Sequence, residues 1–160
     1  NIIMAAQQCE GLTEKQIIVI PTATVPQGIT AMMNADLEED DPQAIADAMA
    51  QAAQTVTTAQ VTYAARDSEF DGHHIAQGDF MALAEGKLVA TGRELGPVVD
   101  ALAEKLCAGG CNFITLLYGE GADEAQAEEV RARFAARSGG AEINVLPGGQ
   151  PVYSYIVSVE

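Results

Sequence analysis

The chain has 160 residues and a mass of 16.7 kDa, and 48% of its residues are hydrophobic. This is enough for one sizeable core and too little for two, so we expect a single domain over residues 1–160. Twenty-three acidic residues against eight basic ones give a formal net charge of −15, which repels phosphate backbones and argues against nucleic acid as a partner. The charge favours solubility in the cytoplasm over a dedicated acidic docking face, and both interpretations stay open.

Neither the apolar runs nor the cysteines indicate a membrane or an oxidising compartment. The longest apolar runs, such as Ile17–Ile20, have strand length, far below the ~20 residues that a membrane span needs. Three cysteines are an odd number and do not suggest a disulfide framework, which favours the reducing cytoplasm. The chain starts at Asn1 with neither an initiator methionine nor a secretion signal, so we expect it to be the interior of a longer protein.

The first third of the chain predicts helices around one buried strand. IIMAAQQC reads as a helix over 2–9, and QIIVIP reads as a fully apolar strand over 16–21. In the helix expected over 22–34, Thr22 or Thr24 is the cap, and the inward face consists of Ile29, Met32 and Met33. Asp41 and Pro42 are expected to open the next helix, with an inward face of Ile45, Met49 and Ala52.

From Thr55 the pattern alternates with a period of two, which predicts antiparallel strands over about 55–92 with hairpin turns at 71–72 and 85–86. Helical spacing returns from Leu95 to Leu106 and again in 123–140, where Val130 and Phe134 are the inward pair. Strands are predicted over 111–119, 141–147 and 152–160. This alternation of helices and strands is typical of an α/β domain with an antiparallel insert.

The sequence favours neither a zinc site nor a phosphate-binding motif. Cys107, Cys111, His73 and His74 include zinc-type ligands, but adjacent histidines in an extended segment point to opposite faces, so buried or incidental thiols are the preferred interpretation. No phosphate-binding glycine motif follows a strand. We therefore expect no metal, catalytic residue or cofactor on this chain.

Two loops carry the candidate binding residues. In PTATVPQG, the hydroxyls of Thr22 and Thr24 and the Gln27 amide lie at a helix start, where they either cap the helix or hold a carboxylate. In the closing PGGQPVY, Gly148, Gly149 and Gln150 allow a close backbone approach and offer an amide, or form only a turn. GGQ also occurs in the peptidyl-tRNA hydrolysing loop of release factors, which the net charge of −15 rejects.

Four segments in the order of the chain resemble the carboxyl-terminal region of bacterial proteins that begin with a dihydroxyacetone-kinase-like ATP domain, the kinase subunit of the fatty acid kinase system. They are IIVIPTATVPQGITAM, QVTYAARDSEFDGHHIAQGDFMALAEGKLVATG, FITLLYGEGADEAQAEEV and PGGQPVYSYIVSVE. The last is the most specific, although Ser154 stands where the family is expected to have proline.

The resemblance implies a DegV-like (EDD-type) fold, a mixed sheet flanked by helices, in the carboxyl-terminal portion of a multidomain kinase-like protein. It further implies that this domain is non-catalytic and docks a lipid-loaded, DegV-family fatty-acid-binding protein, whose fatty acid becomes acyl phosphate for phospholipid synthesis. ATP and Mg would then bind the separate kinase domain of the same polypeptide, in which the resemblance also implies a middle domain with the catalytic and dimerising elements. The alternatives are a DegV-like module that binds a fatty acid or other small carboxylate itself, and an independent enzyme.

Overall fold

A computed structural model describes residues 2–160, apart from the side chain of Glu10. The chain forms two compact units, a first unit that ends at Val56 and a second unit from Thr57 to Glu160. The single domain expected over residues 1–160 stays a prediction. Within the described residues, no helix is long and apolar enough to cross a membrane.

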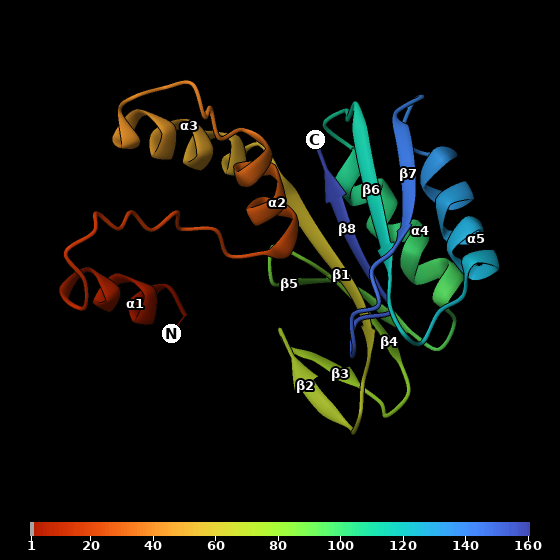
Figure 1. The fold of residues 1–160 in the computed structure, drawn as a ribbon. Helices are drawn as coiled ribbons and strands as arrows, with labels where there is room; N and C mark the ends of the chain where they lie inside the picture. Colours follow the sequence, from red (N-terminus) through yellow and green to blue (C-terminus); the bar gives the residue numbers. More distant parts are fainter. Residues whose placement is uncertain (1) are drawn as a thin grey trace. The chain divides into compact units, whose positions relative to one another are not determined.

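The first unit is helical. It contains α1 (Ile2–Gln7), the 3-10 helix η1 (Gln8–Gly11), α2 (Val25–Met33) and α3 (Pro42–Gln54), and α2 packs against α3 (Figure 1). The predicted caps are confirmed. Thr24 Oγ1 accepts a hydrogen bond from the backbone N–H of Gln27 at 3.3 Å, and Asp41 Oδ1 accepts one from the backbone N–H of Gln43 at 3.0 Å. Pro42 begins α3, where its missing N–H is not needed.

The predicted strand over 16–21 is wrong. Residues 16–21 form no regular element, and Ile17–Ile20 are only half-buried. A strand requires a neighbouring backbone to complete its hydrogen bonds, and the sheet orders contain only strands of the second unit. An apolar run predicts burial but does not supply a pairing partner.

The predicted inward face of α2 is also wrong. Ile29, Met32 and Met33 are 41%, 66% and 80% exposed, whereas Pro26 and Ala31 are buried. On α3 the fully buried residues are Ala46 and Ala53, while Ile45, Met49 and Ala52 are half-buried. Both helices thus bury alanines, which leaves the longer apolar side chains outside the contact.

The second unit contains a six-stranded mixed sheet in the order β5-β4-β1-β8-β6-β7 and a separate two-stranded ribbon, β2-β3. All neighbouring strands are antiparallel except β6 and β7, which are parallel and joined through α5. The strand bounds are β1 (Thr57–Tyr63), β2 (Ser68–Phe70), β3 (His73–Ile75), β4 (Phe80–Ala84), β5 (Lys87–Gly92), β6 (Phe113–Tyr118), β7 (Glu142–Pro147) and β8 (Tyr155–Val159).

The hairpins predicted within 55–92 are confirmed. Asp71 and Gly72 have φ of 49° and 77°, and Glu85 and Gly86 have φ of 48° and 76°, the left-handed pairs that tight two-residue hairpins require. The structure also sharpens the predicted insert: β1, β4 and β5 belong to the main sheet, and only β2 and β3 form a separate ribbon.

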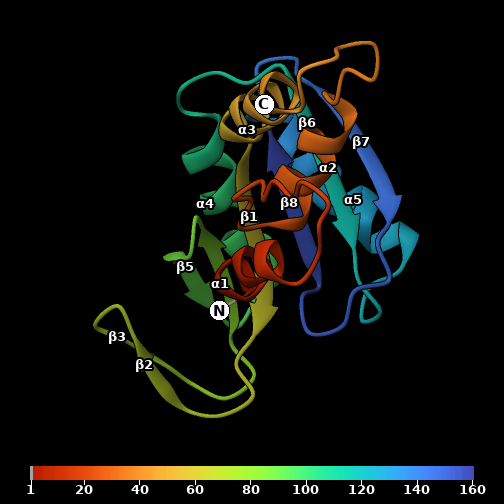
Figure 2. The ribbon, with the colours of Figure 1, turned by 60° about the vertical axis from the view of Figure 1, so that its left-hand side comes forward.

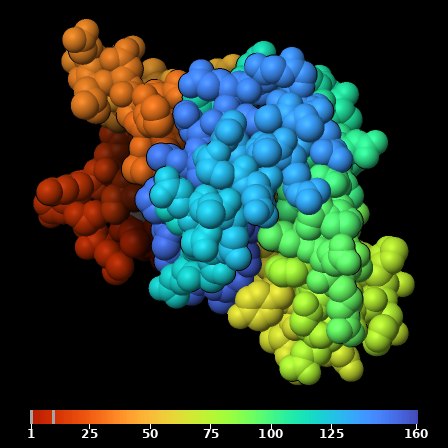
Figure 3. Space-filling model, turned by 90° about the vertical axis from the view of Figure 1, so that its right-hand side faces the viewer, coloured from red at the N-terminus to blue at the C-terminus, as the bar shows by residue number. Residues whose placement is uncertain are grey.

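Two helices, α4 (Leu95–Cys107) and α5 (Glu124–Ala135), pack against each other and against the sheet (Figures 1 and 2). As predicted, α5 turns Val130 and Phe134 inward. Figure 3 shows the outer surface of this helical layer, with the β2-β3 ribbon at its lower edge. Strand β8 lies between β1 and β6, and all five of its residues are buried. The core between helices and sheet includes Val61, Leu102, Ile114, Leu116, Phe134, Tyr155 and Val157.

Candidate functional site

The Thr22–Gln27 loop uses its polar groups to start α2. Besides the Thr24 cap, Gln27 Oε1 accepts a hydrogen bond from the Ala23 amide at 3.0 Å, and Gln27 Nε2 donates one to the Val56 carbonyl at 3.5 Å. Thr22 is half-buried, and its amide donates to the Ile20 carbonyl at 2.8 Å. The contacts of Thr24 and Gln27 therefore match the capping interpretation of the sequence.

A small hollow lies beside this loop, lined by Ile20, Pro21, Gln27, Ala50, Ala53 and Gln54, with a volume of about 80 Å³. A water molecule takes up about 30 Å³ of liquid, whereas pockets for drug-sized ligands measure roughly 300–1,000 Å³. This hollow therefore suits a few water molecules and not an acyl chain.

The second candidate loop links β7 to β8, and we call Gly148–Ser154 the crossing loop. It runs from β7 past the end of β6: the Gly148 and Gly149 amides donate to the Tyr118 carbonyl at 2.9 and 3.2 Å. It then reaches β1, because the Thr62 hydroxyl donates to the Val152 carbonyl at 2.8 Å. The crossing loop thus spans the end of the sheet over β6 and β8.

Gln150 holds the crossing loop from within. Its side-chain amide donates to the Leu117 carbonyl at 3.0 Å and to the Tyr153 carbonyl at 3.3 Å. Glycine is required at Gly119, where a Cβ would collide with the Tyr153 carbonyl, whereas a Cβ on Gly148 would displace the Gln150 side chain from its present position. The contacts of Gln150 are therefore with backbone groups of β6 and of its own loop.

Val152 is a residue of this loop that the sequence analysis missed. Its φ is 72°, in the left-handed region that β-branched residues rarely adopt, and its side chain is 69% exposed. No sequence signal could have identified it, because valine is among the residues least expected at positive φ. The hydrogen bond from Thr62 and the Gln150 clasp hold the backbone on either side.

The six predicted site residues fall into two groups in different units. Thr22, Thr24 and Gln27 belong to the first unit, and Gly148, Gly149 and Gln150 belong to the second. Each group is brought together locally by the contacts described above. Their assignment to a ligand or a partner stays a prediction.

Of the two cysteines in the zinc hypothesis, Cys107 is the last residue of α4 and Cys111 lies in the loop before β6. Cys107 is buried, and burial, together with a hydrogen bond to the Cys111 side chain, raises its pKa to about 12. Cys111 is half-buried, and its Sγ lies 3.8 Å from the Ser138 carbonyl oxygen. The protonated thiol of Cys107 is a poor nucleophile at neutral pH. Across residues 2–160, no three histidine, cysteine, aspartate or glutamate side chains are grouped to hold a metal ion.

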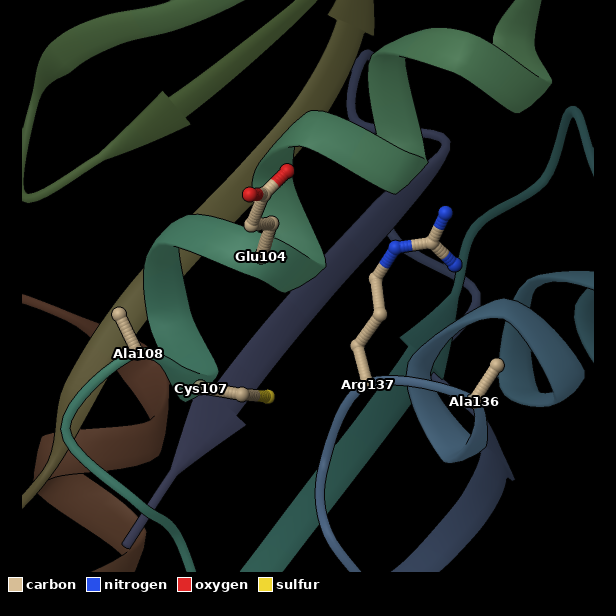
Figure 4. A pocket seen from close by; sticks show the side chains of 5 residues that line it. All are labelled: Glu104, Cys107, Ala108, Ala136 and Arg137. Atoms are coloured by element: carbon tan, nitrogen blue, oxygen red, sulfur yellow. The ribbon is translucent and has the colours of Figure 1, made fainter.

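Cys107 also lines an open hollow of about 650 Å³ between the ends of α4 and α5, together with Glu104, Ala108, Ala136 and Arg137 (Figure 4). The Arg137 guanidinium forms an ion pair with Asp100 at 3.1 Å, and Arg133 binds the same carboxylate at 2.8 Å. Because these side chains are partly exposed, the ion pairs contribute little to stability. Their arrangement ties α5 to α4.

Buried Tyr155, at the start of β8, is a further titratable group near the crossing loop. Burial raises the pKa of its hydroxyl, and the negative charges of Asp123 and Glu129 raise it further. The phenol is therefore neutral at physiological pH. It contributes to the core, where its side chain is 1% exposed.

The chain is similar in sequence to part of a longer bacterial protein. Protein YloV of Bacillus subtilis is 37% identical over 162 residues, an alignment that covers 100% of this chain and 29% of that protein. The chain therefore spans less than a third of the length of this curated relative.

Two solved DegV-family structures share the fold. Cg2579 of Corynebacterium glutamicum superimposes with a TM-score of 0.71 at 14% identity and covers 98% of this chain and 68% of that one. A protein of Ruminococcus gnavus, described with vaccenic acid, has a TM-score of 0.62 at 15% identity and covers 99% and 65%. The predicted DegV-like mixed α/β fold is thus confirmed.

The family model for the C-terminal domain of FakA-like fatty acid kinase subunits matches residues 1–160. The resemblance stated from the sequence is confirmed along the whole chain, and the protein belongs to the family of FakA-like fatty acid kinase C-terminal domains.

Proposed function

We propose that this chain is the non-catalytic domain of a fatty acid kinase subunit, in which it docks a lipid-loaded, DegV-family fatty-acid-binding protein. Docking would bring the fatty acid carboxylate to a separate kinase domain of the same polypeptide. There the γ-phosphoryl group of ATP passes to a carboxylate oxygen and leaves ADP and an acyl phosphate, which feeds phospholipid synthesis. The match of the family model to residues 1–160 is the observation that carries this proposal.

The local chemistry supports a docking role over a catalytic one. The Gln27 and Gln150 amides bind backbone carbonyls, and the pKa of Cys107 is raised to about 12. These groups stabilise loops and core, whereas a nucleophile or general base needs a pKa near the working pH. We place ATP and Mg on the dihydroxyacetone-kinase-like domain and the whole protein in the cytoplasm.

A second function, direct binding of a fatty acid or another small carboxylate, is supported by one comparison. The Ruminococcus gnavus protein that shares this fold is described with vaccenic acid. In this alternative the Thr22 and Thr24 hydroxyls at the start of α2 would hold the carboxylate, in addition to their contacts within the loop.

Lipid extraction followed by mass spectrometry separates the two functions. For docking, we expect no stoichiometric fatty acid in the purified chain, and calorimetric binding of a fatty-acid-loaded DegV-family protein. That carrier protein, extracted in parallel, is the positive control for lipid recovery. A stoichiometric fatty acid in this chain, without binding of the carrier, would overturn the docking function in favour of the alternative. ATP consumption by the chain alone would instead establish an independent enzyme.

A further inference from the structure

The crossing loop, Gly148–Ser154, is held in place by hydrogen bonds to two strands, β6 and β1, and to the segment that follows β6. Gly148 and Gly149 donate to Tyr118 of β6, the Gln150 amide binds the Leu117 carbonyl, and Thr62 of β1 binds Val152. The Gln150 carbonyl in turn accepts a hydrogen bond from the Glu120 amide at 3.1 Å. The conformation of the loop is therefore determined by many contacts that do not involve the Val152 side chain.

These contacts hold the Val152 backbone at a strained, positive φ. Burial of the valine side chain does not compensate for this strain. At a φ of 72° the valine Cβ crowds the backbone, yet the side chain is 69% exposed to solvent. Strain of this kind persists where surrounding contacts over-determine the backbone, and it is concentrated at functional sites. The loop thus presents a rigid apolar side chain to solvent.

Apolar side chains and carboxylates are exposed on the crossing loop and on the chain segments that adjoin it. Pro147 and Pro151 are exposed beside it in the sequence, and Leu146, at the end of β7, is 49% exposed. Exposed Glu120, Asp123 and Glu124 lie on the segment that follows β6, which the Glu120–Gln150 hydrogen bond joins to the crossing loop. Residues 119–124 and 146–154 contain no lysine or arginine.

We propose that the crossing loop is the docking surface for the fatty-acid carrier, with Val152 as its apolar anchor; this inference rests on the proposed function. The matching site on the carrier is an apolar recess rimmed by lysine and arginine side chains, because residues 146–154 expose apolar side chains and the charged residues of 119–124 are all carboxylates. A second copy of the chain is a poor occupant, since each copy carries a net charge of −15. A rigid loop favours binding because it loses little freedom on association.

Substitutions of Val152 that keep its backbone conformation test the anchor. Val152→Asn and Val152→Gly both remove the apolar side chain, and both residues tolerate positive φ. In calorimetric titration with a purified, fatty-acid-loaded DegV-family protein, we expect each variant to bind about tenfold more weakly than the wild type. The thermal midpoint should stay equal or rise, since the strain is relieved. The matched control is Leu37→Asn, at a loop residue of the first unit that is 89% exposed, and its affinity should be unchanged.

The charged border is tested by Glu120→Gln with Glu124→Gln and by salt. We expect the double variant to bind more weakly and with a smaller dependence on ionic strength than the wild type.

Failure of the wild type to bind the carrier would overturn the proposed function and this surface with it. Normal binding by both Val152 variants would overturn the surface alone. Self-association of the wild type that Val152→Asn abolishes would overturn the choice of occupant.

Discussion

The two units of the chain treat their large apolar side chains in opposite ways. Within the described residues, the largest fully buried side chains all lie in the second unit: Val61, Ile75, Val99, Leu102, Ile114, Leu116, Phe134, Tyr155 and Val157. The first unit buries Ala31, Ala46, Ala53 and Val56 and exposes Ile2, Met4, Leu12, Val25, Ile29, Met32, Met33 and Leu37. A sheet covered by two helices encloses large side chains, whereas two helices that bury mainly alanines leave them outside.

This difference predicts unequal costs for removing large apolar side chains. Phe134→Ala leaves a cavity in a site that is 0% exposed and should destabilise the second unit by about 3–5 kcal/mol. Met33→Ala, at a site that is 80% exposed, should change stability by less than about 0.5 kcal/mol. Hydrogen exchange with mass spectrometry measures both, with β6 and β8 amides reporting on the second unit and α3 amides on the first. Equal losses of protection would show that the units do not differ in packing.

The two units should also differ in the alkylation rates of their cysteines. Because burial raises the pKa of Cys107 to about 12 from an ordinary value of 9.0, its thiolate fraction at pH 8 should be lower by roughly three orders of magnitude. We expect iodoacetamide to alkylate the half-buried Cys9 of the first unit long before Cys107, as followed by peptide mass spectrometry. In urea the two rates should converge. Equal rates in the native protein would contradict the burial of Cys107.

The same raised pKa makes stability depend on pH at alkaline values. The folded state favours the protonated Cys107 thiol. The contribution of this thiol to the free energy of unfolding is therefore fully present below pH 9 and is lost as the pH rises toward 12. The Tyr155 hydroxyl, whose pKa burial also raises, acts in the same direction. Cys107→Ala should therefore flatten part of the alkaline decline in unfolding free energy, measured by denaturant titration.

Glycine-to-alanine substitutions should have opposite signs in the two units. A Cβ on Gly119 would meet the Tyr153 carbonyl and lie 2.5 Å from the Gln150 carbonyl, so Gly119→Ala should destabilise by about 1–3 kcal/mol. Within α2, a Cβ on Gly28 would meet only Thr22 Oγ1 at 3.7 Å, an ordinary contact. Gly28→Ala should therefore stabilise by up to about 1 kcal/mol through helix propensity. Thermal unfolding of the two variants measures both, and a loss of stability in each would contradict the open environment of Gly28.

Local signals in the sequence predicted local structure well. The Asp71–Gly72 and Glu85–Gly86 turns, the Thr24 and Asp41 caps and the inward pair Val130 and Phe134 were all predictable, because each depends on residues within a few positions. The strand over 16–21 was wrong because pairing depends on a distant backbone. The inward face of α2 was wrong because the partner helix buries alanines, which no pattern within α2 reveals.

The sequence predicted which loops carry the candidate residues, whose role stays a prediction, but it did not predict the long-range contacts that hold these loops. The family resemblance drew attention to Gly148–Gln150, and the glycines do permit a close approach. The clasp that Gln150 forms with Leu117 spans 33 residues, and the hydrogen bond from Thr62 to Val152 spans 90. Contacts at such separations, and the positive φ of Val152 that they maintain, follow from the sheet order and leave no mark in the local sequence.

The helix caps provide the finest comparison, since both units use an aspartate in the same role. Asp123 Oδ1 accepts a hydrogen bond from the backbone N–H of Gln126 at 2.8 Å, and Asp41 Oδ1 accepts one from the backbone N–H of Gln43 at 3.0 Å. Asp123→Ala and Asp41→Ala should each destabilise by about 1 kcal/mol, and the matched Asp→Asn variants by less, because asparagine keeps the acceptor. Hydrogen exchange should localise the first loss to α5 and β6 and the second to α2 and α3, if each unit unfolds separately. A loss of protection that spreads equally over both units in either variant would mean that the two unfold together, despite the difference in their cores.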